Sequence, residues 1–312
     1  MNAAVAGQKG ASYLTLREAE LNDRVRGAYD LMGPICRLCP RACGAKRMAG
    51  QRGTCRAGRR LKVASHNLHF GEEPAISGHG GSGTLFLSHC NLSCVYCQNY
   101  PISQLGHGSH TTSERLGDMM VALQERGAHN INWVTPSHEA AHLLDGLARA
   151  RQKGLTIPIV YNSSGYDAVA ALELLEGVVD IYLPDMRYGD SETAFRYSGV
   201  RDYPEVNRRA VAEMHRQVGD LVTDDEGIGV RGLVIRHLVL PDGLSQTDEI
   251  LGYVAREISD QTAISLMSQF FPAYRAGQSG QIGRRINGKE YRDAKRIMVR
   301  HGMERGWTQD MD

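Results

Sequence analysis

All seven cysteines of this 312-residue chain fall between Cys36 and Cys97, and none follows Cys97. Residues that serve only to pack a core would be scattered more evenly. In a reducing compartment, clustered cysteines are typical of metal ligands rather than disulfides. They divide into a set of four and a set of three: Cys36, Cys39, Cys43 and Cys55, then Cys90, Cys94 and Cys97.

The downstream set has the spacing C-x3-C-x2-C. Three thiolates can hold three irons of a four-iron cube and leave the fourth iron open to a ligand, whereas four thiolates would close the cluster. A structural zinc site needs a fourth ligand, and His89 is awkwardly placed to be one because it adjoins Cys90. The spacing therefore favours an open [4Fe-4S] cluster over a zinc site or buried free thiols.

The upstream set, Cys36-x2-Cys39-x3-Cys43-x11-Cys55, supplies four thiolates. Four thiolates can close a tetrahedral zinc site or ligate a second [4Fe-4S] cluster, and the spacing does not choose between them. The segment 35–58 is rich in Cys, Arg and Gly and has little hydrophobic periodicity. We expect a loop-rich subdomain that is organised by a metal rather than by an apolar core.

Beyond Gly83, short apolar runs alternate with helical patterns, which is typical of βα units around a parallel sheet. We expect strands over 84–88, 130–134, 157–161, 180–183, 232–240 and 263–268. Helices are expected over 15–32, 113–126, 139–153, 167–176, 205–218 and 246–258. The predicted fold is therefore α/β, a partial (β/α)6 TIM-like barrel with an N-terminal helix and a cysteine-rich subdomain, because six units cannot close an eight-stranded barrel.

The expected division has three parts. Residues 1–80 form the N-terminal helix and four-cysteine subdomain, residues 81–270 the partial barrel, and residues 271–312 a helical tail. In the tail we expect Tyr291, Ala294 and Met298 on one helix face and no further strand. Because Cys90 follows the first barrel strand, its loop should lie at the carboxyl-terminal mouth of the barrel, where ligands bind.

Charge and hydropathy exclude several classes of protein. The 36 Lys and Arg residues balance 35 Asp and Glu residues, which does not fit a dedicated nucleic-acid binder. No apolar run reaches the roughly 18 residues of a membrane span, and residues 1–12 lack the pattern of a signal peptide. We expect a soluble, cytoplasmic protein with no membrane and no nucleic-acid partner.

A competing motif is His138-Glu139-Ala140-Ala141-His142, which matches H-E-x-x-H. In such motifs two histidines on one helix face bind zinc while the glutamate polarises a water. Taken alone, the motif predicts a zinc metallopeptidase. It leaves all seven cysteines unexplained, so we keep His138 as an active-site candidate and expect His142 on the helix surface.

Residues 90–99, Cys-Asn-Leu-Ser-Cys-Val-Tyr-Cys-Gln-Asn, resemble the cluster-binding loop of the radical S-adenosylmethionine (SAM) superfamily. Within that superfamily the chain resembles pyruvate formate-lyase activating enzyme-like proteins with an N-terminal cysteine knuckle. The likeness runs from Cys36 to about Pro241. Its ordered landmarks are 36–43, 53–55, 90–97, 132–138, 182–188 and 236–241.

The resemblance implies roles for particular residues. Cys90, Cys94 and Cys97 would bind a [4Fe-4S] cluster whose open iron is chelated by SAM, and Tyr96 would approach the adenine. Where family members carry Gly-Gly-Glu, this chain has Thr135, Pro136, Ser137 and His138, which become the candidates for binding the SAM amine. The remaining candidates for SAM or catalysis lie at later strand ends: Asn162, Ser163, Asp185, Arg187, Arg236 and His237. Of these, Arg236 could pair with the SAM carboxylate, and His138, Arg187 and His237 are the catalytic candidates.

The resemblance further implies that one electron from a flavodoxin or ferredoxin cleaves SAM to methionine and a 5′-deoxyadenosyl radical, which abstracts a substrate hydrogen. Activation of a glycyl radical protein is the substrate hypothesis. Radical modification of a small molecule or of another protein or peptide side chain is the alternative, because similar sequences need not share a substrate. A non-catalytic iron-sulfur carrier is a third class, and it would need neither an open iron nor polar groups at successive strand ends.

Overall fold

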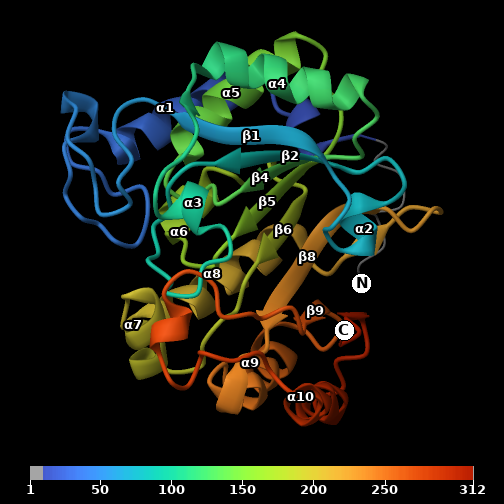
Figure 1. Ribbon diagram of the computed structural model, residues 1–312. Coiled ribbons are helices and arrows are strands. Elements are labelled where there is room, and N and C mark those ends of the chain that lie inside the picture. Colours follow the sequence, from blue (N-terminus) through green and yellow to red (C-terminus); the bar gives the residue numbers. More distant parts are fainter. Residues whose placement is uncertain (1–9, 312) are drawn as a thin grey trace.

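A ten-stranded sheet organises the computed structural model, which describes residues 10–311 (Figure 1). Residues 1–9 and 312 lie outside the described residues. They belong to the first and last of the three expected parts, and residues 1–9 also belong to the start that we expected to lack a signal peptide. The strands are β1 (Lys62–His69), β2 (Ser82–Leu87), β3 (Ser109–His110), β4 (Ile131–Val134), β5 (Ile159–Ser163), β6 (Ile181–Pro184), β7 (Val222–Thr223), β8 (Gly229–Leu238), β9 (Ala263–Met267) and β10 (Gly306–Thr308). Their order across the sheet is β10-β9-β8-β6-β5-β4-β2-β1-β3, and β7 pairs with β8 off this path.

Six consecutive strands of this sheet are parallel and form a partial barrel: β2, β4, β5, β6, β8 and β9. Each overlaps one of the six strands predicted from the sequence. Among the described residues β2 and β9 do not pair with each other, so the sheet stays open. The α/β class and the (β/α)6 order are therefore confirmed, and the carboxyl ends of all six strands lie at one edge.

The helices are α1 (Glu18–Met32), α2 (Pro74–Ser77), α3 (Tyr100–Ser103), α4 (Ser113–Glu125), α5 (Ala140–Gln152), α6 (Val169–Glu173), α7 (Ser191–Ser198), α8 (Tyr203–Val218), α9 (Thr247–Tyr253) and α10 (Gly288–Arg300). In Figure 1, α1, α4 and α5 lie over one end of the sheet beside β1 and β2, and α9 and α10 lie at the other end. Within residues 10–311, no helix is both long and apolar enough to span a membrane.

Helices α4 and α5 pack closely because small residues face each other. A Cβ atom on Gly117 would lie 3.1 Å from the carbonyl oxygen of Gly146, so a larger side chain would push the helices apart. Below them, Leu116, Met120 and Leu123 of α4 are fully buried against the sheet. Each such side chain contributes about 1.5–3 kcal/mol when it leaves water.

The tail departs from the sequence prediction. Strand β10 lies beyond 271, where we expected no strand, and pairs in parallel with β9. Its three residues are too few to show the alternation of apolar and polar residues from which a strand can be predicted. A Cβ on Gly306 would lie 2.0 Å from the carbonyl oxygen of Ile264, so only glycine allows the strands to meet there. The predicted buried face of α10, with Tyr291, Ala294 and Met298, is confirmed.

Residues 33–61 contain no helix or strand apart from a single 3-10 turn, Arg47–Ala49. The segment is tied to the barrel by Arg47, which is 1% exposed and forms a 3.0 Å ion pair with Glu139. Arg47 also donates to the carbonyl oxygens of Gly58 and His138. The three-domain division stays a prediction, although β1, for which no strand was predicted, pairs with the first barrel strand.

Gly165, which follows β5, provides a test of this packing. Its φ is 68°, and an added Cβ would lie 2.2 Å from the Asp185 carbonyl and from Asn207 Nδ2. We predict that Gly165→Ala lowers the free energy of unfolding by about 3 kcal/mol, because backbone strain and overpacking add. Gly154 is the matched control: its φ is 92° but nothing lies within 4 Å, so Gly154→Ala should cost only about 1 kcal/mol. Urea denaturation measures both, and equal losses would contradict the prediction.

Candidate active site

The loop after β2 carries the three downstream cysteines. Cys94 is buried, and Cys90 and Cys97 are half-buried. Burial, and after it the neighbouring thiol of Cys94, raises the pKa of Cys90 to about 12. The thiols are therefore close enough to influence one another, and they ionise only when a positive centre compensates for burial.

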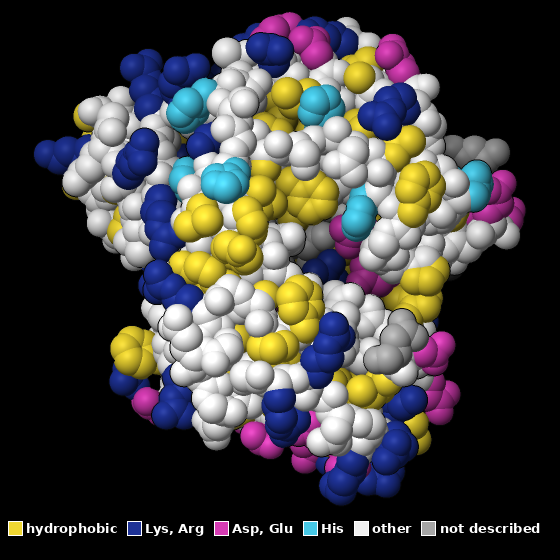
Figure 2. Space-filling model, viewed as in Figure 1, with side chains coloured by type: hydrophobic (Ala, Val, Ile, Leu, Met, Phe, Trp, Pro, Cys, Tyr) yellow, Lys and Arg dark blue, Asp and Glu magenta, His cyan; other side chains and the backbone are white. Residues whose placement is uncertain are grey.

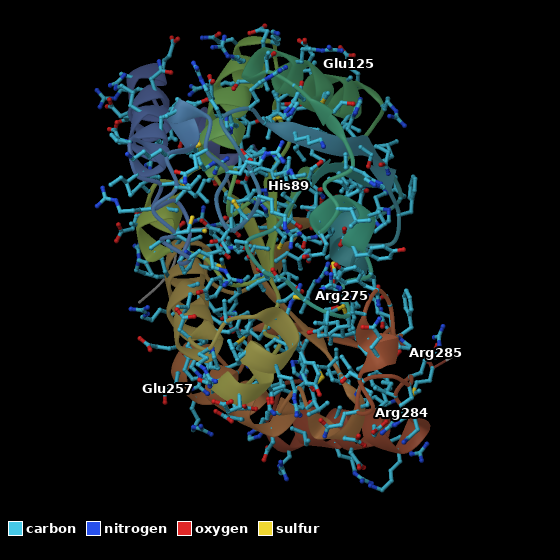
Figure 3. All side chains as sticks on the ribbon, turned by 60° about the vertical axis from the view of Figure 1, so that its left-hand side comes forward. His89, Glu125, Glu257, Arg275, Arg284 and Arg285 are labelled. Carbon is cyan, nitrogen blue, oxygen red and sulfur yellow. The ribbon has the colours of Figure 1, made fainter. Side chains whose placement is uncertain are left out.

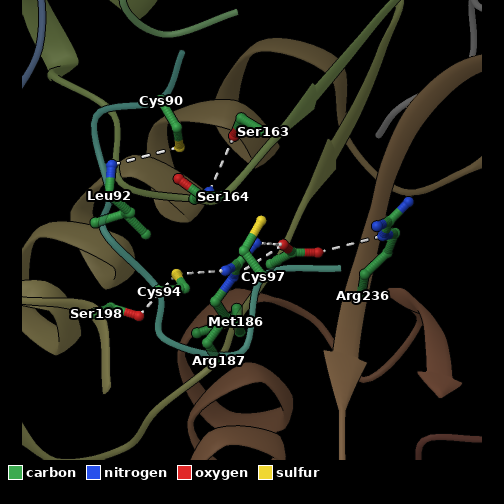
Figure 4. A network of polar contacts seen from close by, with 12 residues as sticks. Cys90, Leu92, Cys94, Cys97, Ser163, Ser164, Met186, Arg187, Ser198 and Arg236 are labelled. Carbon is green, nitrogen blue, oxygen red and sulfur yellow. Dashed lines mark hydrogen bonds and ion pairs between the residues drawn. The ribbon is translucent and has the colours of Figure 1, made fainter. Parts of the chain in front are cut away.

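Each of the three sulfurs has a polar partner, and Figure 4 shows those of Cys90 and Cys94. Cys94 Sγ lies 2.9 Å from Ser198 Oγ and accepts a hydrogen bond of 3.0 Å from Arg187 Nη1. The other contacts are Cys97 Sγ with Ser103 Oγ at 3.0 Å, and Cys90 Sγ with the backbone amide of Leu92 at 3.4 Å. Donors aimed at sulfur suit a thiolate-ligated cluster, because hydrogen bonds to the sulfurs tune its potential.

The thiols nevertheless do not converge on one point. No group of three or more His, Cys, Asp or Glu side chains within residues 10–311 is arranged to hold a metal ion. The three sulfurs face their hydroxyl, amide and guanidinium partners instead. Binding would require the thiols to turn together, so the metals at both cysteine sets stay predictions.

A chain of ion pairs crosses the mouth beside this loop. Asp185, just after β6, accepts from Arg187 Nη2 at 2.5 Å and from Arg236 Nε at 3.2 Å. Arg236 Nη1 also lies 3.1 Å from Glu72 Oε2. Burial acts to raise the pKa of Asp185, but Arg187 and Arg236 together hold it below its ordinary value. The charges thus link Glu72 to the Cys94 thiol through Arg236, Asp185 and Arg187.

Glu72 was not among the site residues predicted from the sequence. It lies between β1 and α2 with its side chain 8% exposed, and this burial raises its pKa despite the neighbouring Arg236. Because β1 was not predicted, nothing placed this segment beside the barrel mouth. The adjacent acids Glu72 and Glu73 within an otherwise glycine-rich stretch were the one available signal.

A cavity of about 120 Å³ adjoins the loop. Its lining includes Tyr96, Cys97, Asp185, Arg187 and Arg236. The structure therefore brings five of the predicted site residues together around one space. Figure 2 shows a hollow on this face of the molecule with basic and acidic side chains inside it.

A larger groove of about 700 Å³ lies next to this cavity, and the two share Gln98 and Gln269. Phe270, Phe271 and Arg285 lie along the groove. In Figure 3 the side chains of Arg284 and Arg285 lie on the C-terminal part of the molecule, away from the centrally placed His89. The cavity at the mouth thus adjoins a larger, open groove.

The ends of β4 and β5 do not line this cavity. Thr135 has φ 62°, a conformation that favours glycine, and its amide donates to the Asn162 carbonyl at 2.9 Å. Ser163 Oγ donates to Asp167 at 2.6 Å and so stabilises its own turn. Thr135, Pro136, Ser137, Asn162 and Ser163 are not part of the cavity lining. Their proposed contacts with SAM stay predictions.

The H-E-x-x-H pattern does not form a zinc site of the metallopeptidase type. Helix α5 begins only at Ala140, so His138 is not on the same helix as His142. We expected His142 on the helix surface, but this prediction is wrong, because His142 is buried. It contacts Glu139 Oε2 at 2.6 Å and the Arg59 carbonyl at 3.1 Å. Glu139 is paired with a buried arginine and is not free to polarise a water.

His237 is fully buried on β8 and is not part of the cavity lining. Its Nδ1 contacts the Met186 carbonyl at 2.7 Å and its Nε2 contacts Thr247 Oγ1 at 2.9 Å. Burial lowers the pKa of His237 to about 4. The ring holds β8 against neighbouring elements, and its predicted catalytic role has no contact with the cavity to support it.

No protein-family model matches the chain. An uncharacterized protein of Methanocaldococcus jannaschii is 29% identical over 276 residues, which cover 86% of this chain and 75% of that protein. Because the name of that relative states no activity, the likeness adds no function.

Solved structures give weaker matches. SuiB of Streptococcus suis, bound to the precursor peptide SuiA, has 12% identity and a TM-score of 0.48, over 71% of this chain and 46% of SuiB. A radical SAM methyltransferase of Sphaerobacter thermophilus has 15% identity and a TM-score of 0.46, over 96% of this chain and 94% of that one. The chain spans about half the length of SuiB. Scores this low carry no argument about activity.

The ion pairs at the mouth can be tested by stability. We predict that Arg187→Met lowers the free energy of unfolding by about 3 kcal/mol, because Asp185 loses one of two partners and Cys94 loses its charged donor. Arg209 is the matched control, since its 3.7 Å ion pair with Glu205 is exposed, and Arg209→Met should change stability by less than about 0.5 kcal/mol. Urea denaturation distinguishes the two, and similar small losses would sink the prediction.

The buried His237 should make stability depend on pH. The unfolded chain binds this proton near pH 6.5, whereas the folded chain binds it near pH 4. Protonation therefore favours unfolding, and His237 removes about 3 kcal/mol of stability as the pH falls from 6.5 to 4. In His237→Asn this part of the pH dependence should vanish. Denaturation of both proteins across that range is the measurement, and parallel profiles would be the contrary result.

Proposed function

We propose that the chain is a radical SAM enzyme that holds a [4Fe-4S] cluster at Cys90, Cys94 and Cys97. The observation that carries the proposal is the position of these thiols, in one loop at the carboxyl end of the first parallel strand, beside a cavity of about 120 Å³. A simple electron carrier needs no such cavity and no charged groups at neighbouring strand ends. Ligands of parallel α/β folds bind at this edge.

When bound, the cluster and SAM supply a 5′-deoxyadenosyl radical that takes a hydrogen from the substrate. The residues of the chain bind and orient the reactants. Arg236, in the cavity lining, would pair with the SAM carboxylate, and Tyr96 would lie against the adenine. Arg187 would keep donating to Cys94 and so adjust the electron density on the thiolate that would hold the cluster.

The proposed substrate is a protein segment, and activation of a glycyl radical protein is the form that the family resemblance suggests. The groove of about 700 Å³ that shares Gln98 and Gln269 with the inner cavity supports an extended substrate. A small molecule would need only the inner cavity. Radical modification of a small molecule or of another protein or peptide side chain is the alternative.

An electron must reach the cluster from outside the chain. A flavodoxin or ferredoxin is the proposed donor, in keeping with the family resemblance. The assignment to pyruvate formate-lyase activating enzyme-like proteins rests on the ordered sequence landmarks and belongs to the same proposal.

The decisive experiment is anaerobic reconstitution followed by reduction with dithionite in the presence of SAM. The wild type should bind about four irons at the downstream cysteines and should release 5′-deoxyadenosine. In Cys94→Ala, product should fall to the level seen without dithionite, because the cluster loses a buried ligand.

Arg209→Met serves as the control variant, because Arg209 lies outside the site and forms only an exposed ion pair. It should form product as the wild type does. Equal product from the wild type and Cys94→Ala would overturn the proposed function. Iron bound without any 5′-deoxyadenosine would instead favour the electron carrier.

A further inference from the structure

A second, smaller cavity lies between the segment 33–61 and the start of α5. All four upstream cysteines line it, together with Arg47 and His138. The sulfurs of Cys43 and Cys55 also approach Gly53, where an added Cβ would lie 3.1 and 3.5 Å from them. Four thiols and one imidazole therefore surround this space, whereas the metal site predicted from the sequence included only the four cysteines.

The size of this space favours one ion. Its volume is about 10 Å³, close to the space that a single water-sized atom needs. A four-iron cube with its bridging sulfides has eight atoms and needs more room than this. Zinc, by contrast, is held at about 2.3 Å by thiolates and about 2.0 Å by imidazole.

His138 has the hydrogen-bonding pattern of a metal ligand. Its Nε2 lies 2.9 Å from the carbonyl oxygen of Ser88, and a carbonyl can only accept, so Nε2 carries the proton. The lone pair is therefore on Nδ1, which is buried and has no hydrogen-bond partner among the described residues. Histidines that bind metals usually donate their other ring N–H to a carbonyl or carboxylate in this way.

The thiols differ in their exposure. Cys36, Cys39 and Cys55 are buried, whereas Cys43 is exposed. Structural zinc sites are closed and four-coordinate. Three buried thiols and one buried imidazole complete such a set without the exposed cysteine.

We propose that this cavity binds a single zinc ion through Cys36, Cys39, Cys55 and His138 Nδ1. The thiols turn inward when the ion binds, since they are not arranged around one point in the structure. Arg47, which is 1% exposed and lines the same cavity, offsets part of the thiolate charge. With four protein ligands the site has no open position, so it is structural: it crosslinks the segment 33–61 to the connection between β4 and α5.

Zinc K-edge X-ray absorption of the anaerobically purified wild type tests this proposal directly. We expect about one zinc per chain with three sulfur neighbours and one nitrogen neighbour. Four sulfurs and no nitrogen would overturn the ligand set. Absence of zinc, or about eight irons per chain after reconstitution, would overturn the site.

Two variants separate the ligands. His138→Gln should weaken zinc binding by about 100-fold or more in competition with a chelator, whereas Cys43→Ser should bind zinc as the wild type does. Loss of zinc from Cys43→Ser with retention in His138→Gln would reverse the assignment. If His138→Gln does not fold, the absorption spectrum of the wild type still decides. Zinc content is independent of 5′-deoxyadenosine formation, so this proposal and the proposed function can fail separately.

Discussion

The arrangement of the barrel mouth depends on the ion pairs of Asp185 with Arg187 and Arg236. Glu72 extends the network by pairing with Arg236. These partners come from different parts of the chain, since Glu72 precedes α2, Arg187 follows β6 and Arg236 lies on β8. A buried charge left without a partner costs several kcal/mol, so these segments are stable only in the arrangement that pairs all four. The pairing is reinforced by the backbone, where the Met186 amide donates to the Arg236 carbonyl. Arg187 then brings this constraint to the Cys94 sulfur.

The strand ends around this network hold unusual backbone conformations. His89, immediately before the cysteine loop, has φ 74°, and Thr135, at the end of β4, has φ 62°. Such strain in residues other than glycine persists only where the surrounding structure enforces it, and it gathers at functional sites. At Thr135 the backbone therefore has a shape that favours glycine, although the residue is a threonine.

The six parallel strands could be predicted because each is a buried apolar run between clear helical patterns, and strand ends then placed Asp185 and Arg236 at one mouth. Strand β1, which pairs antiparallel with β2 and β3, was missed because its exposure alternates poorly, and with it Glu72 was missed. His142 was misplaced because its polar type suggested a surface, whereas Glu139 and a backbone carbonyl satisfy both ring nitrogens inside the fold. Periodicity reports which residues face the core, but it does not report which buried polar groups find partners across the chain.

One link between the two cysteine sets runs through Ser88. The Ser88 carbonyl accepts from His138 Nε2, beside the upstream thiols, and its hydroxyl donates to the His107 carbonyl at 2.7 Å. Only His89 separates Ser88 from Cys90. An ion that fixes His138 would therefore fix the start of the cysteine loop as well, through a hydrogen bond rather than through a shared ligand. The upstream set then needs no redox role to matter for the downstream one, because a rigid anchor at Ser88 limits how far Cys90 can move when its thiol turns toward a metal.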